Sequence, residues 1–142
     1  MKRPSVQSYS RSENMRRIRS KDTVPEWTVR RLAYSLGYRY RLYRKDLPGK
    51  PDLVFPGRKK VIFIHGCFWH QHPGCKEGRL PKTNKDYWQP KLERNVARDC
   101  AAQEQLASLG WDVLVLWECE IKEIERVRRV LIDFLGAQKR GV

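Results

Sequence analysis

The stretch with the most reactive side chains is IHGCFWHQHPGC, from Ile64 to Cys75. It holds two cysteines, three histidines, a phenylalanine and a tryptophan. Thiolates and imidazoles bind zinc, histidine transfers protons near neutral pH, and aromatic rings stack on bases. The stretch therefore suits a metal site, a catalytic site or a nucleic-acid contact, and the rest of the chain has to decide among them.

The cysteines and one histidine have a spacing close to that of compact structural zinc sites. Cys67, His72 and Cys75 follow a C-x4-H-x2-C pattern. Cys119 ends the last predicted strand, and a neighbouring strand would bring it beside this loop as a fourth ligand. His70 is an alternative ligand, although spacing favours His72 because the loop needs room to curl. The alternative for Cys75 and Cys119 is a pair of ordinary buried thiols.

Asp52 is the best candidate for a catalytic cation site. It follows Pro51 at the start of a predicted strand, where a rigid carboxylate oxygen can bind a hard divalent cation. Such a cation stabilises the charge that develops on a phosphodiester during cleavage. The alternative is a simple turn aspartate.

The elements that position these residues follow from hydrophobic periodicity and turn signals. Thr23, Pro25 and Glu26 form a helix start with a capping box, and Gly37 ends that helix. The remaining elements are expected to be strands at 38–43, 52–55, 61–64 and 111–117 and helices at 84–109, chiefly past Pro90, and 124–134. The order α-β-β-β-α-β-α predicts an α/β fold with one mixed β-sheet flanked by helices.

The 142-residue chain fits one folded domain at 23–136, with a basic arm at 1–22 that orders on DNA and a tail at 137–142. The net charge of +14 predicts a polyanionic partner. No apolar leader follows Met1, and no run is long enough to span a bilayer. We therefore expect no membrane partner and a reducing cytoplasmic setting.

The tryptophans divide by context. Phe68 and Trp69 lie in a polar loop, where we favour insertion between bases over a satellite core around zinc. For Trp88 the two readings are close. Trp27 and Trp117 lie in apolar patterns and are expected in the core, as is Cys100.

Several linked motifs together resemble the very-short-patch-repair (Vsr) DNA mismatch endonucleases. They are HGCFWH at 65–70, PGKPD at 48–52, KLERNV at 91–96 with Arg98 and Asp99, and LGWDVL at 109–114 with WEC at 117–119. The resemblance runs from about Ser10 to Cys119. It implies a restriction-endonuclease-like fold and an enzyme that nicks one strand beside the thymine of a T:G mismatch, the product of 5-methylcytosine deamination.

The resemblance also implies a role for each site residue. Asp52 and the backbone carbonyl of Ile64 would hold magnesium. His70 would be the general base, with His65 beside it at the waters and phosphate, and Glu26 would support the waters around the ion. The implied structural zinc ligands are Cys67, His72, Cys75 and Cys119. For Glu26, the capping box alone is an equally good account.

The implied DNA contacts come from two sides of the duplex. Phe68, Trp69 and Trp88 would form a wedge, and Met15 and Ile18 would approach from the other groove. Lys91 and Asn95 lie on the same helix as Trp88.

The expected partner is mismatched double-stranded DNA, bound by a monomer in the bacterial cytoplasm at the nucleoid, with repair proteins as further partners. Two alternatives remain open: a non-catalytic, zinc-stabilised module that binds distorted DNA, and a zinc hydrolase with an open metal position.

Overall fold

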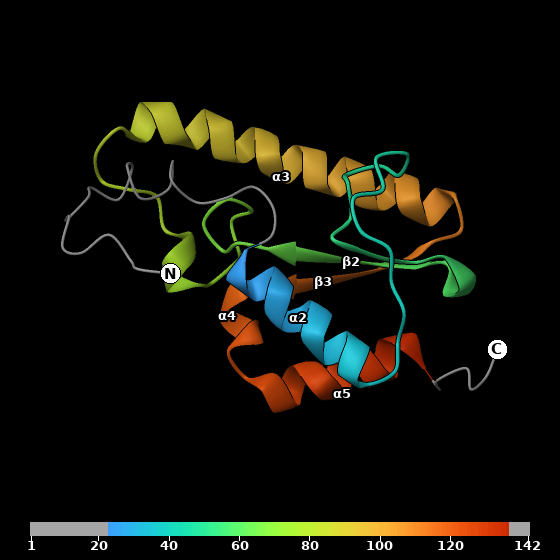
Figure 1. The fold of residues 1–142 in the computed structure, drawn as a ribbon. Coiled ribbons are helices and arrows are strands. Elements are labelled where there is room, and N and C mark those ends of the chain that lie inside the picture. Colours follow the sequence, from blue (N-terminus) through green and yellow to red (C-terminus); the bar gives the residue numbers. More distant parts are fainter. Residues whose placement is uncertain (1–22, 137–142) are drawn as a thin grey trace.

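The computed structural model describes residues 23–136. A three-stranded sheet lies between the long helix α3 on one face and helices α2 and α5 on the other (Figure 1). The elements in chain order are α2 (Val24–Ser35), β1 (Leu53–Phe55), the short 3-10 turn η1 (Pro56–Arg58), β2 (Lys60–His65), η2 (Lys76–Gly78), α3 (Lys85–Ser108), β3 (Asp112–Trp117), α4 (Glu118–Ile121) and α5 (Ile124–Leu135).

The sheet is mixed, as predicted. β1 pairs antiparallel with β2, with Leu53 opposite Ile62. β2 pairs parallel with β3, and His65 lies opposite Trp117 at the end of both strands. A parallel pair needs a crossover connection, and the 24-residue helix α3 supplies it.

Alternate residues of the strands pack against opposite helical layers. Leu53, Ile62 and Leu116 belong to the cluster that includes residues of α2 and α5. Val54, Val61 and Phe63 belong to a second cluster with Leu106 of α3. Because successive side chains of a strand point to opposite faces, a sheet covered on both sides needs continuous apolar runs. The run at 61–64 was predicted to be buried on both faces for this reason, and it is.

The prediction of a strand at 38–43 is wrong. Within this segment only Arg41 pairs with the sheet, in an isolated bridge to Val54 with N–H···O distances of 2.8 and 3.0 Å. Tyr43 then has a φ of 58°, a left-handed conformation that ends an extended run. The alternation of tyrosine and arginine thus reflects a half-buried connection.

The start of one helix and the presence of another also differ from expectation. Helix α3 begins at Lys85, five residues before Pro90. A proline in the second turn removes one backbone hydrogen bond, which the rest of a long helix can outweigh. Helix α4 was not predicted at all; it is a single turn that follows directly after β3.

Some apolar residues expected in the core lie at the surface instead. Trp27 is 47% exposed, and its ring lies against the guanidinium groups of Arg30 and Arg31, 5.1 and 5.8 Å from its centroid. Cys100 is exposed on α3. Trp27 shares its face of α2 with the exposed Val24 and Tyr34, and Cys100 lies away from the buried residues of α3. Within 23–136, the structure contains no helix that is both long and apolar enough to cross a bilayer.

Candidate functional site

The start of α2 holds a buried carboxylate. The side chain of Thr23 accepts a hydrogen bond from the Glu26 N–H at 3.4 Å, and the Glu26 carboxylate accepts one from the Thr23 N–H at 3.3 Å. The predicted capping box is therefore present. The same Glu26 Oε2 also accepts a bond of 3.2 Å from Arg30, and both side chains are buried. Glu26 thus makes more contacts than a cap requires.

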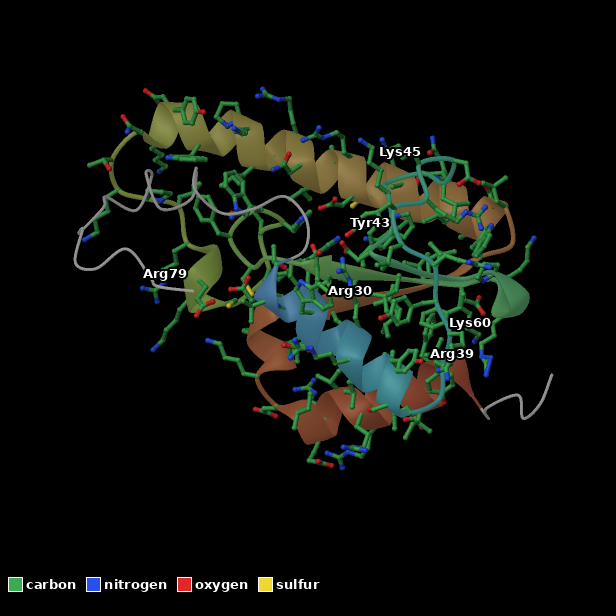
Figure 2. The ribbon with its side chains drawn as sticks, in the orientation of Figure 1. Arg30, Arg39, Tyr43, Lys45, Lys60 and Arg79 are labelled. Atoms are coloured by element: carbon green, nitrogen blue, oxygen red, sulfur yellow. The ribbon has the colours of Figure 1, made fainter. Side chains whose placement is uncertain are left out.

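Arg30 lies between this carboxylate and two aromatic rings. Its guanidinium carbon is 5.1 Å from the Trp27 ring centroid and 5.8 Å from that of Tyr43. Figure 2 shows Arg30 on α2 and Tyr43 on the segment that crosses nearby. The ion pair of Arg30 and Glu26 is itself buried, beside these partly exposed rings.

Asp52 joins the start of β1 to the end of β2. Its Oδ2 accepts a hydrogen bond of 2.6 Å from the Ile64 N–H, and its own N–H donates to the Ile62 carbonyl at 3.0 Å. Burial raises the pKa of Asp52 to about 7; the Ile64 N–H lowers it, and the nearby Glu26 carboxyl raises it further. Two carboxyl groups held together with little water form a site that a cation would stabilise.

His65, the last residue of β2, and His70, in the loop that follows, form a stacked pair. Their ring centroids are 3.8 Å apart and the planes differ by 8°. His65 is 4% exposed. Its burial and the nearby His70 lower the pKa of His65 to about 4, so that its imidazole is neutral at physiological pH. Nδ1 of His70 lies 2.6 Å from Oδ2 of Asp99, on helix α3.

Asp99 was not among the predicted site residues. Its signal was nevertheless in the sequence, because Lys91, Asn95 and Asp99 are spaced four residues apart on one helix and so share a face. Asn95 of this face donates a hydrogen bond of 3.2 Å to the Trp69 carbonyl. Helix α3 therefore contacts the loop after β2 through Asn95 and Asp99, which lie one turn apart.

The three predicted cysteines and His72 come together. Their donor atoms all lie within 4.8 Å of one another. Nδ1 of His72 is 3.7 Å from Sγ of Cys67 and 3.4 Å from Sγ of Cys119. The parallel pairing of β2 and β3 places Cys119, just after β3, beside the loop after β2. His72, and not His70, is the histidine of this group.

The cysteines and His72 form a group that could hold a metal ion, whereas magnesium at Asp52 stays a prediction. Three thiols with one imidazole are a typical set for structural zinc, whereas a carboxylate and backbone carbonyl oxygens suit magnesium. Burial raises the pKa of the Cys67 thiol to about 12, and the Glu77 N–H lowers that of Cys75. An ion at the cysteine site must displace protons, so its binding is pH-dependent.

The aromatic residues of the loop pack together beside α3. Phe68, Trp88 and Leu92 are buried in a third hydrophobic cluster, with Trp69 partly buried against them. The ring of Phe68 is 5.4 Å from Trp88 and 5.4 Å from Trp69, edge-on in both cases. This is the satellite core that the sequence left as the alternative. DNA contact by these rings stays a prediction.

A cation lies over the exposed side of this cluster. Nζ of Lys91 is 5.5 to 5.7 Å from the ring centroids of Trp69, Tyr87 and Trp88. The lysine therefore adds positive charge beside the partly exposed Trp69 and the exposed Tyr87. Met15 and Ile18, the other predicted DNA contacts, lie outside the described residues.

Comparison with known proteins gives consistent results. Residues 6–76 match the family model of DNA mismatch endonuclease Vsr. The chain is 54% identical to the type II nicking enzyme V.XorIIP of Xanthomonas oryzae pv. oryzae, over 82% of this chain and 88% of that protein. It is 46% identical to the type II nicking enzyme V.NmeAIP of Neisseria meningitidis, over 89% and 93%. It is 40% identical to DNA mismatch endonuclease Vsr of Escherichia coli, over 83% and 75%.

Proposed function

Because the chain belongs to the Vsr family of DNA mismatch endonucleases and is a DNA endonuclease, we propose that it nicks one strand of a duplex beside the thymine of a T:G mismatch in a magnesium-dependent reaction. The observation that carries this proposal is a pair of neighbouring carboxyl groups, Asp52 and Glu26, beside the end of β2, where the rings of His65 and His70 are stacked. Asp52 is bonded to the N–H of Ile64, and His65 is the next residue. The arrangement fits the restriction-endonuclease-like fold that the motifs imply.

Asp52 and the carbonyl of Ile64 would hold the magnesium ion. The carboxylate is anchored by the Ile64 N–H at 2.6 Å, so its position is fixed before any ion arrives. An ion held there would stabilise negative charge on the phosphate and the leaving oxygen. Glu26 lies beside Asp52 and accepts a hydrogen bond of 3.2 Å from Arg30, which fixes its position. From there it would orient water near the ion.

His70 would accept the proton of the attacking water. Asp99 lies 2.6 Å from Nδ1 and favours the tautomer with the proton on that nitrogen, which leaves Nε2 free as a base. His65 lies flat against His70 and is neutral, so it supports the ring without repelling a positive charge that forms on it. His70 would then act as a general base toward the attacking water, with His65 packed against it.

Zinc at Cys67, His72, Cys75 and Cys119 would stiffen the loop that carries the histidines. Four donors gather there, a complete set for a closed structural site. This argues against a hydrolase whose zinc keeps an open position.

DNA binding would use the basic surface and the aromatic cluster. The net charge of +14 supports phosphate contacts. Trp69 and Lys91 occupy the more accessible side of the cluster, whereas insertion of Phe68 or Trp88 requires it to open. Asn95 would contact a base edge or the backbone, and Met15 and Ile18 the other groove.

A strand-specific nicking assay tests the proposal. The substrates are duplexes with each mismatch in several flanking sequences, with magnesium present or chelated. We expect one strand of the T:G duplex to be cut, only with magnesium. Cutting in chelator removes the magnesium requirement, and equal cutting of all mismatches removes the T:G preference. Tight binding without any cutting would favour the non-catalytic alternative.

A further inference from the structure

The two histidines and Asp99 form a donor group chemically different from the site at Asp52. One ring nitrogen from each of His65 and His70 and one oxygen of Asp99 lie within 4.8 Å of one another. Two ligand atoms on opposite sides of a zinc-sized ion are about 4.2 Å apart, because each bond is about 2.1 Å long. The three donor atoms are therefore nearly close enough to share one ion. Because a bound ion lies in the plane of an imidazole and the two rings are stacked face to face, one ring must turn before both nitrogens point at that ion.

His65 supplies a second observation that points to a ligand. Its side chain is 4% exposed. Within the part of the chain that the structure describes, Nδ1 of this ring is buried and has no hydrogen-bond partner. Buried polar atoms are nearly always paired. A ring nitrogen that presents a lone pair in such a place would be satisfied by a metal ion.

We propose that His65, His70 and Asp99 bind a first-row transition-metal ion, such as Co²⁺, Ni²⁺ or Zn²⁺, and that this ion inhibits the endonuclease. Imidazole nitrogen favours these ions over magnesium, whereas the oxygens around Asp52 favour magnesium. The thiols of Cys67, Cys75 and Cys119, in the third donor set, favour zinc. Three donor sets around one loop therefore select ions by different chemistry.

Ion binding and inhibition rest on different grounds. Binding rests on the geometry of the three side chains alone. Inhibition rests on the proposed function, in which His70 accepts a proton while Asp99 holds its other nitrogen at 2.6 Å. An ion bound to both groups displaces the proton from between them, moves the two atoms farther apart than their present 2.6 Å, and holds the ring where it cannot reach the water.

A cobalt titration tests the binding. The protein is the full-length, zinc-loaded chain carrying Asp52→Asn, which removes the magnesium-site carboxylate. Without magnesium or DNA, we expect it to bind one further equivalent of Co²⁺ by equilibrium dialysis. Visible d–d absorption should appear without the near-ultraviolet thiolate-to-cobalt band that a cysteine site gives.

Further substitutions in the same background locate the ion. Adding Asp99→Asn or His70→Gln should abolish the cobalt equivalent and leave the zinc content unchanged. Glu104→Gln, at an exposed carboxylate of the same helix, should leave both unchanged. No bound cobalt in the Asp52→Asn protein, or equal binding after Asp99→Asn, would overturn the proposed site.

Nicking by the unsubstituted protein tests the inhibition. At fixed magnesium, saturating Co²⁺ should lower the rate by about tenfold or more, since general-base catalysis typically contributes at least that much. Bound cobalt with an unchanged rate would overturn the inhibition and keep the site. No nicking with magnesium alone would instead overturn the proposed function, and the binding result would stand.

Discussion

The carboxylate of Asp99 lies 2.6 Å from Nδ1 of His70, across the gap between helix α3 and the loop after β2. The two residues are 29 positions apart. This contact fixes the orientation of the ring that lies flat on His65. The long helix is therefore part of the candidate site as well as a cover for the sheet.

Asp99→Asn should lower the nicking rate on the order of 100-fold, because the amide no longer favours the tautomer that leaves Nε2 free. The KM for DNA should change little, since Asp99 faces His70. Steady-state kinetics on a mismatched duplex measures both. Glu104→Gln is the matched control, and a rate of the Asp99→Asn variant equal to that of the control would contradict the role.

Asp52→Asn should abolish nicking and, in chelator, make the protein more stable. The folded pKa of about 7 lies above the ordinary value of 3.8. Folding therefore favours the protonated acid, and this group loses stability as the pH rises from about 4 to 7. The loss is of order 2 to 4 kcal/mol at pH 8.

The measurement is the melting temperature of Asp52→Asn against wild type in chelator. A gain of several degrees is expected at pH 8, with a smaller gain at pH 5. Asp133→Asn, at an exposed position of α5, should show no such trend. A gain in melting temperature that is equal at both pH values would show that burial does not raise the pKa of Asp52.

Cys119→Ser should lose zinc and a large part of the folding stability, because a structural site needs all four ligands. Chelator competition and metal analysis should show less than one zinc per chain, and the melting temperature should fall by about 10 °C or more. Cys100→Ser removes an exposed thiol and should change neither value. Full zinc content in Cys119→Ser would reopen the question of an open coordination position.

Gly49→Ala should destabilise the turn before Asp52. A Cβ at Gly49 would lie 2.7 Å from Cβ of Ala102 and 3.1 Å from the Phe63 ring, and the φ of 76° adds strain. The expected loss is about 2 to 4 kcal/mol in urea unfolding. Gly74 has a φ of 73° and open space around it, so Gly74→Ala measures the backbone strain alone. Equal losses would remove the packing argument.

Local signals predicted the parts of the fold that depend on neighbouring residues. The capping box at Thr23 and Glu26 is present because its bonds span only three residues. The buried run at 61–64 required a layer on each face, and the helices supply both. Local alternation failed at 38–43, because Tyr43 leaves the extended conformation and only Arg41 reaches the sheet.

The candidate site was harder to predict because its contacts are distant in sequence. Cys119 was placed correctly beside Cys67, since parallel neighbouring strands end at the same edge. Asp99 was missed because its spacing from Lys91 and Asn95 indicates which face of the 24-residue helix it shares, but not which turn of that face lies against the loop. Trp27 was misplaced for a related reason: it shares a helix face with the exposed Val24 and Tyr34, and its ring packs on arginine and not in the core.

The parallel pairing of His65 with Trp117 has a consequence for where residues can be inserted into the chain or deleted from it. The ring of Trp117 lies edge-on to His65 at 5.1 Å and flat on His72 at 4.2 Å, and Cys119 follows two residues later. Deleting or inserting one residue in β3 would turn Trp117 to the opposite face of the sheet. The histidine pair and the zinc ligands would lose their neighbours together, so insertions are tolerable in the loops that enter these strands and not in the strands themselves.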